Sequence, residues 1–200
     1  KMGNLNFIKM SKHWNKNIQS EKANISMGLW PLKTYEKADL RTVLTPDLLI
    51  AGEKIMYTPH AFPVTEAKFQ ENKNKRLIIS HAPSNNSKKG TDSLILPALK
   101  KLSEKYDFEI SLIKGMPHNK CLDLIKKSDI FIDQVLVGFY GNAALEAMSY
   151  GIPTMTYLSE KYLNKIGTSN EKLPIISVQY QTEKAIMEAL EVFLKEPKKL

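Results

Sequence analysis

Residues 76–115 read RLIISHAPSNNSKKGTDSLILPALKKLSEKYDFEISLIKG, and two kinds of pattern alternate along them. Residues 76–82 and 108–115 are apolar runs of strand length, and a polar loop at 83–92 follows the first run. Residues 92–106 carry apolar side chains at helical spacing, at Leu96, Leu99 and Leu102. Strands that are apolar throughout and alternate with helices are typical of a parallel sheet covered on both faces.

The same alternation continues toward the end of the chain. Apolar strands are predicted at 130–134, 153–158 and 174–178, and helices at 119–129, 142–150 and 182–196. The sequence therefore predicts an α/β domain over 76–196, with a Rossmann-like parallel sheet and helices on both of its faces. It contains no GxGxxG motif of the kind that binds dinucleotide cofactors.

The segments before residue 76 show weaker patterns. Short strands are predicted at 42–49 and 54–62, whereas 66–76 is strongly polar and indicates a linker. We expect a partial N-terminal lobe over 1–60, a linker over 61–75 and a C-terminal domain over 76–200. Because the chain begins with Lys1 rather than Met, we expect it to be a piece of a longer protein.

Composition indicates a soluble globular protein. Hydrophobic residues make up 42% and charged residues 25% of the 200 residues. No apolar run approaches the roughly 18 residues of a membrane-spanning helix, and the N-terminus has no signal-peptide core. The single cysteine, Cys121, excludes an internal disulfide and fits a reducing environment, so we expect a cytoplasmic protein.

The net charge of +8 comes almost entirely from lysines, since Arg41 and Arg76 are the only arginines. Proteins that read nucleic acid usually use arginines for base edges and phosphates, so we expect no nucleic-acid partner. The lysines are spread along the chain, which favours a solvated surface coat. The alternative is attraction for an anionic substrate or for the inner face of a membrane.

A second stretch, GFYGNAALEAMSYGIPTMTY at 138–157, joins a glycine-containing loop to an apolar helix. Gly138 and Gly141 allow close approach of the backbone to a ligand, and Asn142 is a favourable N-cap residue. The predicted helix start is an anion site, and Glu146 lies one turn further along on the same face. A carboxylate there is placed to accept hydrogen bonds from sugar hydroxyls. The alternative is an exposed Glu stabilised by the helix dipole.

This stretch closely resembles the donor-binding signature of family 4 retaining glycosyltransferases, which have the GT-B fold. SHAPSNNSKKGTD at 80–92 resembles the family's loop in which a Lys-Gly pair holds the donor diphosphate. GMPHNKCLDLIKKSDIFID at 115–133 resembles the segment whose first loop lies against the nucleobase. ADLRTVLTPDLL at 38–49 and KIMYTPHAF at 54–62 resemble the end of the family's N-terminal domain, so the resemblance covers roughly 38–195.

The resemblance implies a role for each matching residue. It implies that Glu146 holds the ribose and that Lys89, beside Gly90, holds the diphosphate, so these two side chains are the catalytic candidates. It also implies a helix start facing phosphate and donor sugar, and a base-side loop. The helix start comprises Gly141, Asn142 and Ala143, and the base-side loop runs from Gly115 to His118.

The sequence departs from the family pattern at two places. The first acid of the signature falls at Gly138, and Ser and Asn stand where the arginine partner of the lysine is usual. Asp133 is a candidate to supply a nearby carboxylate. His81 is a candidate for phosphate contact or for a structural role, and His118 has a structural alternative as well. The histidines and the cysteine form no pattern typical of a metal site.

The resemblance implies transfer of a hexose from a nucleoside-diphosphate sugar to a sugar or lipid-linked acceptor, with retention at the anomeric carbon. The nucleotide sugar is the donor substrate, and no further cofactor is expected. The expected setting is polysaccharide or glycoconjugate biosynthesis at the cytoplasmic face of a membrane, and this chain alone is expected to be incomplete for catalysis. Two alternatives remain: a non-catalytic GT-B-like subunit that binds a nucleotide or a partner protein, and a sugar-nucleotide epimerase.

Overall fold

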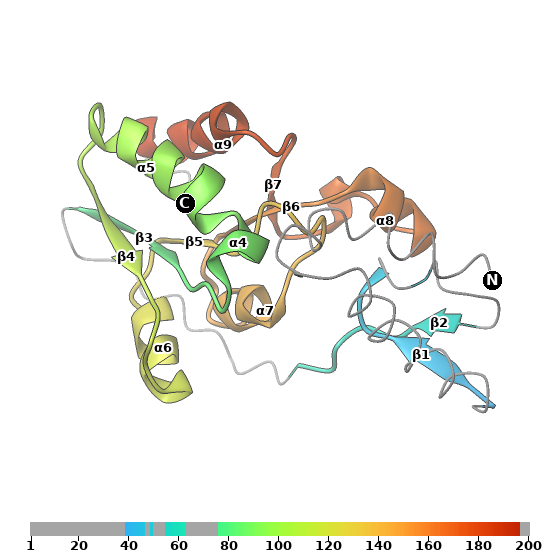
Figure 1. The fold of residues 1–200 in the computed structure, drawn as a ribbon. Helices are drawn as coiled ribbons and strands as arrows, with labels where there is room; N and C mark the ends of the chain where they lie inside the picture. Colours follow the sequence, from blue (N-terminus) through green and yellow to red (C-terminus); the bar gives the residue numbers. More distant parts are fainter. Residues whose placement is uncertain (1–38, 47–48, 50–54, 63–75, 197–200) are drawn as a thin grey trace, which may run out of the picture. The chain divides into compact units, whose positions relative to one another are not determined.

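A five-stranded, wholly parallel sheet organises the computed structural model, which describes residues 39–46, 49, 55–62 and 76–196. Its strand order is β4-β3-β5-β6-β7, so the first strand of the domain lies inside the sheet (Figure 1). His81, at the end of β3, lies opposite Leu112 on one side and Ile132 on the other. The strands are β3 (Leu77–His81), β4 (Phe108–Leu112), β5 (Ile130–Ile132), β6 (Thr154–Tyr157) and β7 (Ile176–Val178).

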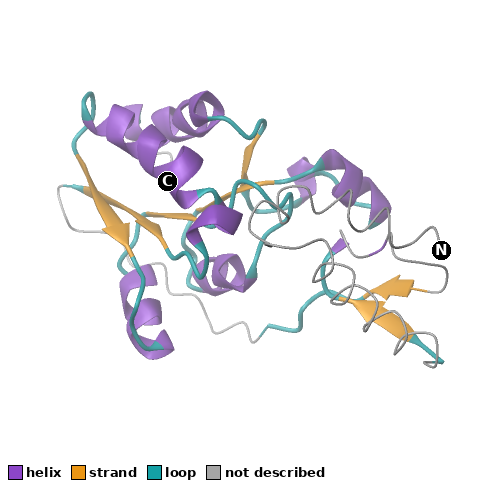
Figure 2. Cartoon of the chain, viewed as in Figure 1, coloured by secondary structure: helices purple, strands orange, loops and turns teal. Residues whose placement is uncertain are grey.

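Helices cover both faces of this sheet (Figures 1 and 2). One face carries α5 (Leu96–Ser103), which continues a π-helix, η2 (Thr91–Ile95), together with α9 (Glu183–Lys195). The other face carries α6 (His118–Ile125) and α7 (Asn142–Ser149). The prediction of a Rossmann-like α/β domain is therefore confirmed.

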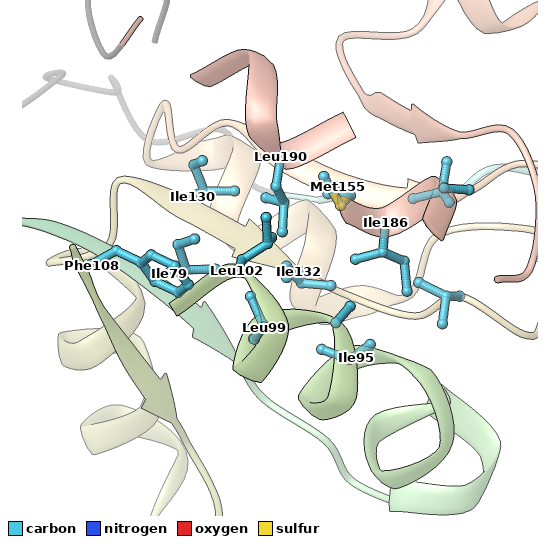
Figure 3. Close-up of a cluster of buried hydrophobic side chains, with 14 residues drawn as sticks. Ile79, Ile95, Leu99, Leu102, Phe108, Ile130, Ile132, Met155, Ile186 and Leu190 are labelled. Atoms are coloured by element: carbon cyan, nitrogen blue, oxygen red, sulfur yellow. The ribbon is translucent and has the colours of Figure 1, made fainter. Parts of the chain in front are cut away.

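Two apolar clusters hold the layers together. The larger one joins Leu99 and Leu102 of α5 and Ile186 and Leu190 of α9 to the sheet, where Ile132 is completely buried (Figure 3). The smaller one lies under α6 and α7. Its buried members are Ile113, Ile125, Phe131, Ala147 and Ile152. The predicted helical spacing at Leu96, Leu99 and Leu102 thus marks the face of α5 that is buried, although Leu96 itself is only half-buried.

Several predicted boundaries differ from the structure. The helix expected over 92–106 begins as η2, because Gly90 O accepts from the N–H groups of both Leu94 and Ile95. The polar loop expected over 83–92 contains a short helix, α4 (Asn86–Lys89), which is capped by the Asn85 side chain. The strand expected over 130–134 ends at Ile132, which leaves Asp133 in the following loop. Besides α4, two further elements of the described residues were not predicted, α8 (Glu160–Lys165) and the 3-10 helix η3 (Asn170–Lys172).

The chain divides into two compact units. One holds β1 (Arg41–Val43), β2 (Ile55–Tyr57) and Lys161–Gly167, and the other holds the five-stranded sheet. β1 and β2 pair in parallel, and the strand predicted over 42–49 stops at Val43 because a bend follows. Residues 1–38 of the predicted lobe and 63–75 of the predicted linker lie outside the described residues. Among the described helices, none combines the length and the apolar character that crossing a membrane requires.

Candidate functional site

The candidate site lies at the carboxyl ends of β3 and β5. From β3 the chain crosses to β4 on one side, and it later returns to β5 on the other side of β3. Loops that leave two such neighbouring strands diverge, and open α/β sheets bind ligands in the space at this switch point. The loop after β3 carries Lys89, and the loop after β5 carries Asp133 and the glycines of the second motif.

Lys89 and Asp133 join these two loops. Lys89 Nζ lies 2.7 Å from Asp133 Oδ1, with side-chain exposures of 10% and 0%. Nζ also donates to Ala82 O at 3.3 Å. The general expectation of a solvated lysine coat is therefore wrong at Lys89, whose ammonium group is drawn inward by a fully buried carboxylate.

Asp133 also fixes the start of α7. Its Oδ2 accepts the Gly141 N–H at 2.6 Å, and a Cβ on Gly141 would lie only 3.3 Å from the same oxygen. Both carboxylate oxygens are thus engaged within the protein. Asp133 lies near the glycine loop as expected, but it does not replace the acid missing at Gly138 as an open acceptor.

Backbone geometry at the end of α4 turns Lys89 toward β5. Gly90 has φ of +79°, a left-handed conformation that favours glycine, and its N–H donates to Asn86 O. A Cβ on Gly90 would lie 2.7 Å from Val135 Cγ2. The Lys89 carbonyl accepts from Val135 N at 3.1 Å, so backbone and side chain of Lys89 both bind the loop after β5.

Of the two roles that the sequence leaves open for His81, the structure supports the structural one. Its Nδ1 donates to Ile132 O at 2.7 Å, and its Nε2 accepts from Thr91 Oγ1 at 2.8 Å, so both ring nitrogens are engaged. The side chain is 1% exposed. Burial in a medium that disfavours charge lowers the His81 pKa to about 4, against the opposing effect of the Ile132 carbonyl.

α7 begins at Asn142 as expected, but its N-cap is Gly141 rather than Asn142. Asn142 is the first residue of the helix and is exposed to solvent. The N–H groups of a first helical turn have no acceptor within the helix, which is the basis of anion binding at such ends. The Gly141 N–H is not available to a ligand, because it donates a hydrogen bond to Asp133. Asn142 and Ala143 remain candidates to donate to a ligand.

Glu146, in the second turn of α7, pairs with the first residue of α6. His118 Nε2 lies 2.7 Å from Glu146 Oε1, and the side-chain exposures are 70% for His118 and 17% for Glu146. Gly115, in the same base-side loop as His118, has φ of +70° with open space where a Cβ would stand. The loop expected to face a nucleobase is therefore next to the carboxylate expected to hold a ribose.

The predicted site residues thus fall into two contact groups joined by α7. Lys89, Asp133 and Gly141 form one group, and His118 with Glu146 forms the other. A groove of about 540 Å³ lies elsewhere, between η2–α5 and the start of α9, and includes Leu94, Lys101 and Met187 in its lining. None of the grouped residues lines that groove, so the charged groups and the sheet topology define the site rather than this hollow.

Two polar residues of the site were not expected from the sequence. Thr91 provides the hydrogen-bond partner of Nε2 of the buried His81. Gln134 stabilises the loop after β5, because its Nε2 donates to Phe139 O at 2.6 Å. Gln134 had a signal in the sequence, since it directly follows Asp133 after a buried strand. Thr91 had none, because its role depends on the π-helical turn that begins at this residue.

Comparison with known proteins adds little to these observations. No family model matches the chain, and a search of curated proteins finds no match. Among solved structures, the chain is similar to the lactose-specific IIB component domain of the phosphoenolpyruvate:carbohydrate phosphotransferase system from Streptococcus pneumoniae. The identity is 16%, the TM-score is 0.28, and the match covers 58% of this chain and 97% of that one. A similarity at this level carries no functional argument.

Proposed function

We propose that this chain binds the donor of a glycosyltransferase that moves a sugar from a nucleoside-diphosphate sugar to an acceptor with retention of anomeric configuration. The observation that carries the proposal is the arrangement at the switch point. Three features follow each other along the chain in the order of the family signature. They are a lysine after β3, a glycine-containing helix start after β5 and a carboxylate in the second turn of α7.

Lys89 is suited to a phosphate that lies beside the two loops. An ammonium group has three N–H donors, and two of them are given to Asp133 and Ala82. The third has no acceptor among the described residues. Because Asp133 neutralises the charge of Lys89, much of the attraction for a diphosphate comes from the N–H groups at the start of α7. Together these donors stabilise the charge that develops on a departing diphosphate.

Glu146 is suited to the ribose. It reaches the surface with 17% of its side chain exposed, and among the described residues its Oε2 has no hydrogen-bond partner. A carboxylate of this kind accepts hydrogen bonds from neighbouring hydroxyls, and such charge-assisted bonds are about twice as strong as neutral ones. The sugar or lipid-linked acceptor, and a location at the cytoplasmic face of a membrane, are parts of the same proposal.

A second function is favoured by two observations. Lys89 is paired with a buried carboxylate, and Gly138 offers no acid to the donor sugar. Both features suit a domain that binds a nucleotide without transferring its sugar. We therefore keep a non-catalytic nucleotide-binding subunit as the alternative.

Calorimetric titration separates these functions from a purely structural domain. The 200-residue chain is titrated with UDP, GDP and ADP and with their glucose conjugates, and bound donors are then incubated and analysed by NMR for released sugar. The transferase proposal predicts micromolar binding of one diphosphate and slow release of a sugar with retained configuration. Binding without release under all conditions supports the non-catalytic alternative. Absence of binding to all six ligands contradicts both.

A further inference from the structure

His118 and Glu146 are held together although they come from different motifs. His118 opens α6 directly after Pro117, and Glu146 lies in the second turn of α7. The Nε2–Oε1 distance of 2.7 Å is that of a strong hydrogen bond. The exposures are unequal, because the imidazole is 70% exposed while the carboxylate is largely covered.

The chemistry of the pair fixes where the hydrogen lies. An ionised carboxylate only accepts, so the hydrogen of this bond is carried by His118 Nε2. Each carboxylate oxygen has two lone pairs, so Glu146 Oε1 retains one acceptor position, and Oε2 has no partner among the described residues. The contact therefore leaves the carboxylate able to accept from two further hydroxyl groups.

We propose that His118 is a positioning residue that holds the Glu146 carboxylate ready to accept both hydroxyls of a ribose cis-diol. This inference rests on the proposed function, since it assigns Glu146 to a nucleotide. A free Glu side chain has several rotatable bonds, and ordering such a side chain during binding lowers affinity. His118 orders the carboxylate before the ligand arrives, so the ligand avoids that loss.

The competing explanation is a surface ion pair that stabilises only the fold. Ion pairs with an exposed partner contribute little to stability, and His118, with 70% of its side chain exposed, is such a partner. The two explanations predict different effects of His118 variants on ligand affinity. A positioning role changes affinity for ligands that carry the diol, whereas a structural role affects all ligands equally or none.

The test is a double-mutant cycle measured with defined probes. UDP, GDP and ADP and their 2′,3′-dideoxy counterparts are titrated calorimetrically into the wild type and into His118→Ala, His118→Gln, Glu146→Gln and the Ala/Gln double variant. Lys120→Ala, an exposed neighbour on α6, is the matched control. His118→Ala is expected to weaken the ribonucleotide by about three- to tenfold and to leave the dideoxynucleotide unchanged. His118→Gln retains an amide donor and should restore most of the affinity.

The cycle separates the failure of this inference from the failure of the proposed function. In the Glu146→Gln background, His118→Ala should have no further effect, because its partner is already changed. If Glu146→Gln weakens only ribonucleotides while His118→Ala weakens neither class or both equally, the positioning role is wrong and the proposed function stands. If Glu146→Gln does not separate the two classes, the assignment of Glu146 to the ribose is wrong and the positioning role fails with it. If no nucleotide binds, the proposed function is wrong as well.

Discussion

Lys89 and Asp133 form a buried ion pair that connects the loops after two adjacent strands, with 2.7 Å between Nζ and Oδ1. Asp133 also accepts a hydrogen bond, at 2.6 Å, from the backbone N–H of Gly141 at the start of α7. One carboxylate thus fixes both the lysine and the helix start that are proposed to face a diphosphate. The sequence alone places neither Lys89 nor Glu146 in the core, so replacing either side chain is expected to change stability little. For Lys89 this expectation is wrong, since the side chain is buried.

Replacing Lys89 by Met should destabilise the domain strongly, because it leaves the Asp133 charge buried without a partner. Breaking a buried pair in this way costs about 3–5 kcal/mol. Urea unfolding followed by circular dichroism measures the loss. Lys100→Met on the exposed part of α5 is the control and should stay within about 0.5 kcal/mol of the wild type.

If Lys89→Met does not fold, the Lys89→Met/Asp133→Asn double variant should, since no charge remains and Asn still accepts from Gly141. Equal stability of Lys89→Met and wild type would contradict the role of the pair.

Gly90 and Gly115 both have positive φ, but only Gly90 is crowded. A Cβ on Gly90 would lie 2.7 Å from Val135 Cγ2, whereas Gly115 faces open space. Gly115→Ala should therefore cost only the backbone strain, about 1–2 kcal/mol, and Gly90→Ala should cost clearly more. Thermal unfolding of the two variants tests the ranking. A Gly90→Ala variant as stable as Gly115→Ala would show that Val135 moves aside freely.

The buried His81 should make stability depend on pH. Its pKa in the folded state is about 4, below the ordinary value of 6.5, so the unfolded chain binds more protons between these values. The free energy of unfolding should therefore fall as pH decreases from about 6.5 to about 4, by about 3 kcal/mol at most. Urea unfolding at pH 4 to 7 measures the decrease. His81→Gln keeps a donor and an acceptor, does not titrate in this range, and should show a shallower pH dependence. Parallel curves for the two proteins would exclude His81 as the source.

Variants of the two proposed ligand contacts should differ in which part of the nucleotide they affect. Lys89→Ala should weaken a nucleoside diphosphate much more than the free nucleoside, because the partner is phosphate. Glu146→Gln keeps the shape but removes the charge, and nucleoside diphosphate affinity should fall about tenfold or more. Calorimetry with the nucleotide that binds best to the wild type provides the measurement. Since Lys89→Ala also affects stability, its titration is made at a temperature where it is shown to be folded. Unchanged affinity in both variants would leave Glu146 as an ordinary helix residue.

The alternation of apolar strands and helices could be predicted from the sequence, because both faces of a parallel sheet are buried. The run at 130–132 illustrates this, since all three residues are buried and the predicted strand extends only two residues too far. The π-helical start at Thr91 could not be predicted, because it depends on Gly90 O accepting two N–H groups at once. No pattern of side chains in the sequence indicates this hydrogen-bonding arrangement.

The contents of the site were partly predictable. The glycine loop and Glu146 could be located from local sequence, since a helix start after a buried strand has a recognisable pattern. The burial of Lys89 could not, because Lys88 and Lys89 are identical in chemistry and only the turn of α4 decides which one meets Asp133. The His118–Glu146 contact joins residues 28 positions apart, on two helices whose proximity depends on the completed sheet.

The position of β3 inside the sheet has a consequence for synthesis on the ribosome. β4 adds to one edge of β3, β5 adds to the other edge, and β6 and β7 then extend that side in order. No strand has to be inserted between two strands that are already paired. The sheet can therefore grow outward as the chain emerges, with each new strand meeting a free edge. Stalled nascent chains that expose residues up to about 150 should already protect β3 from protease.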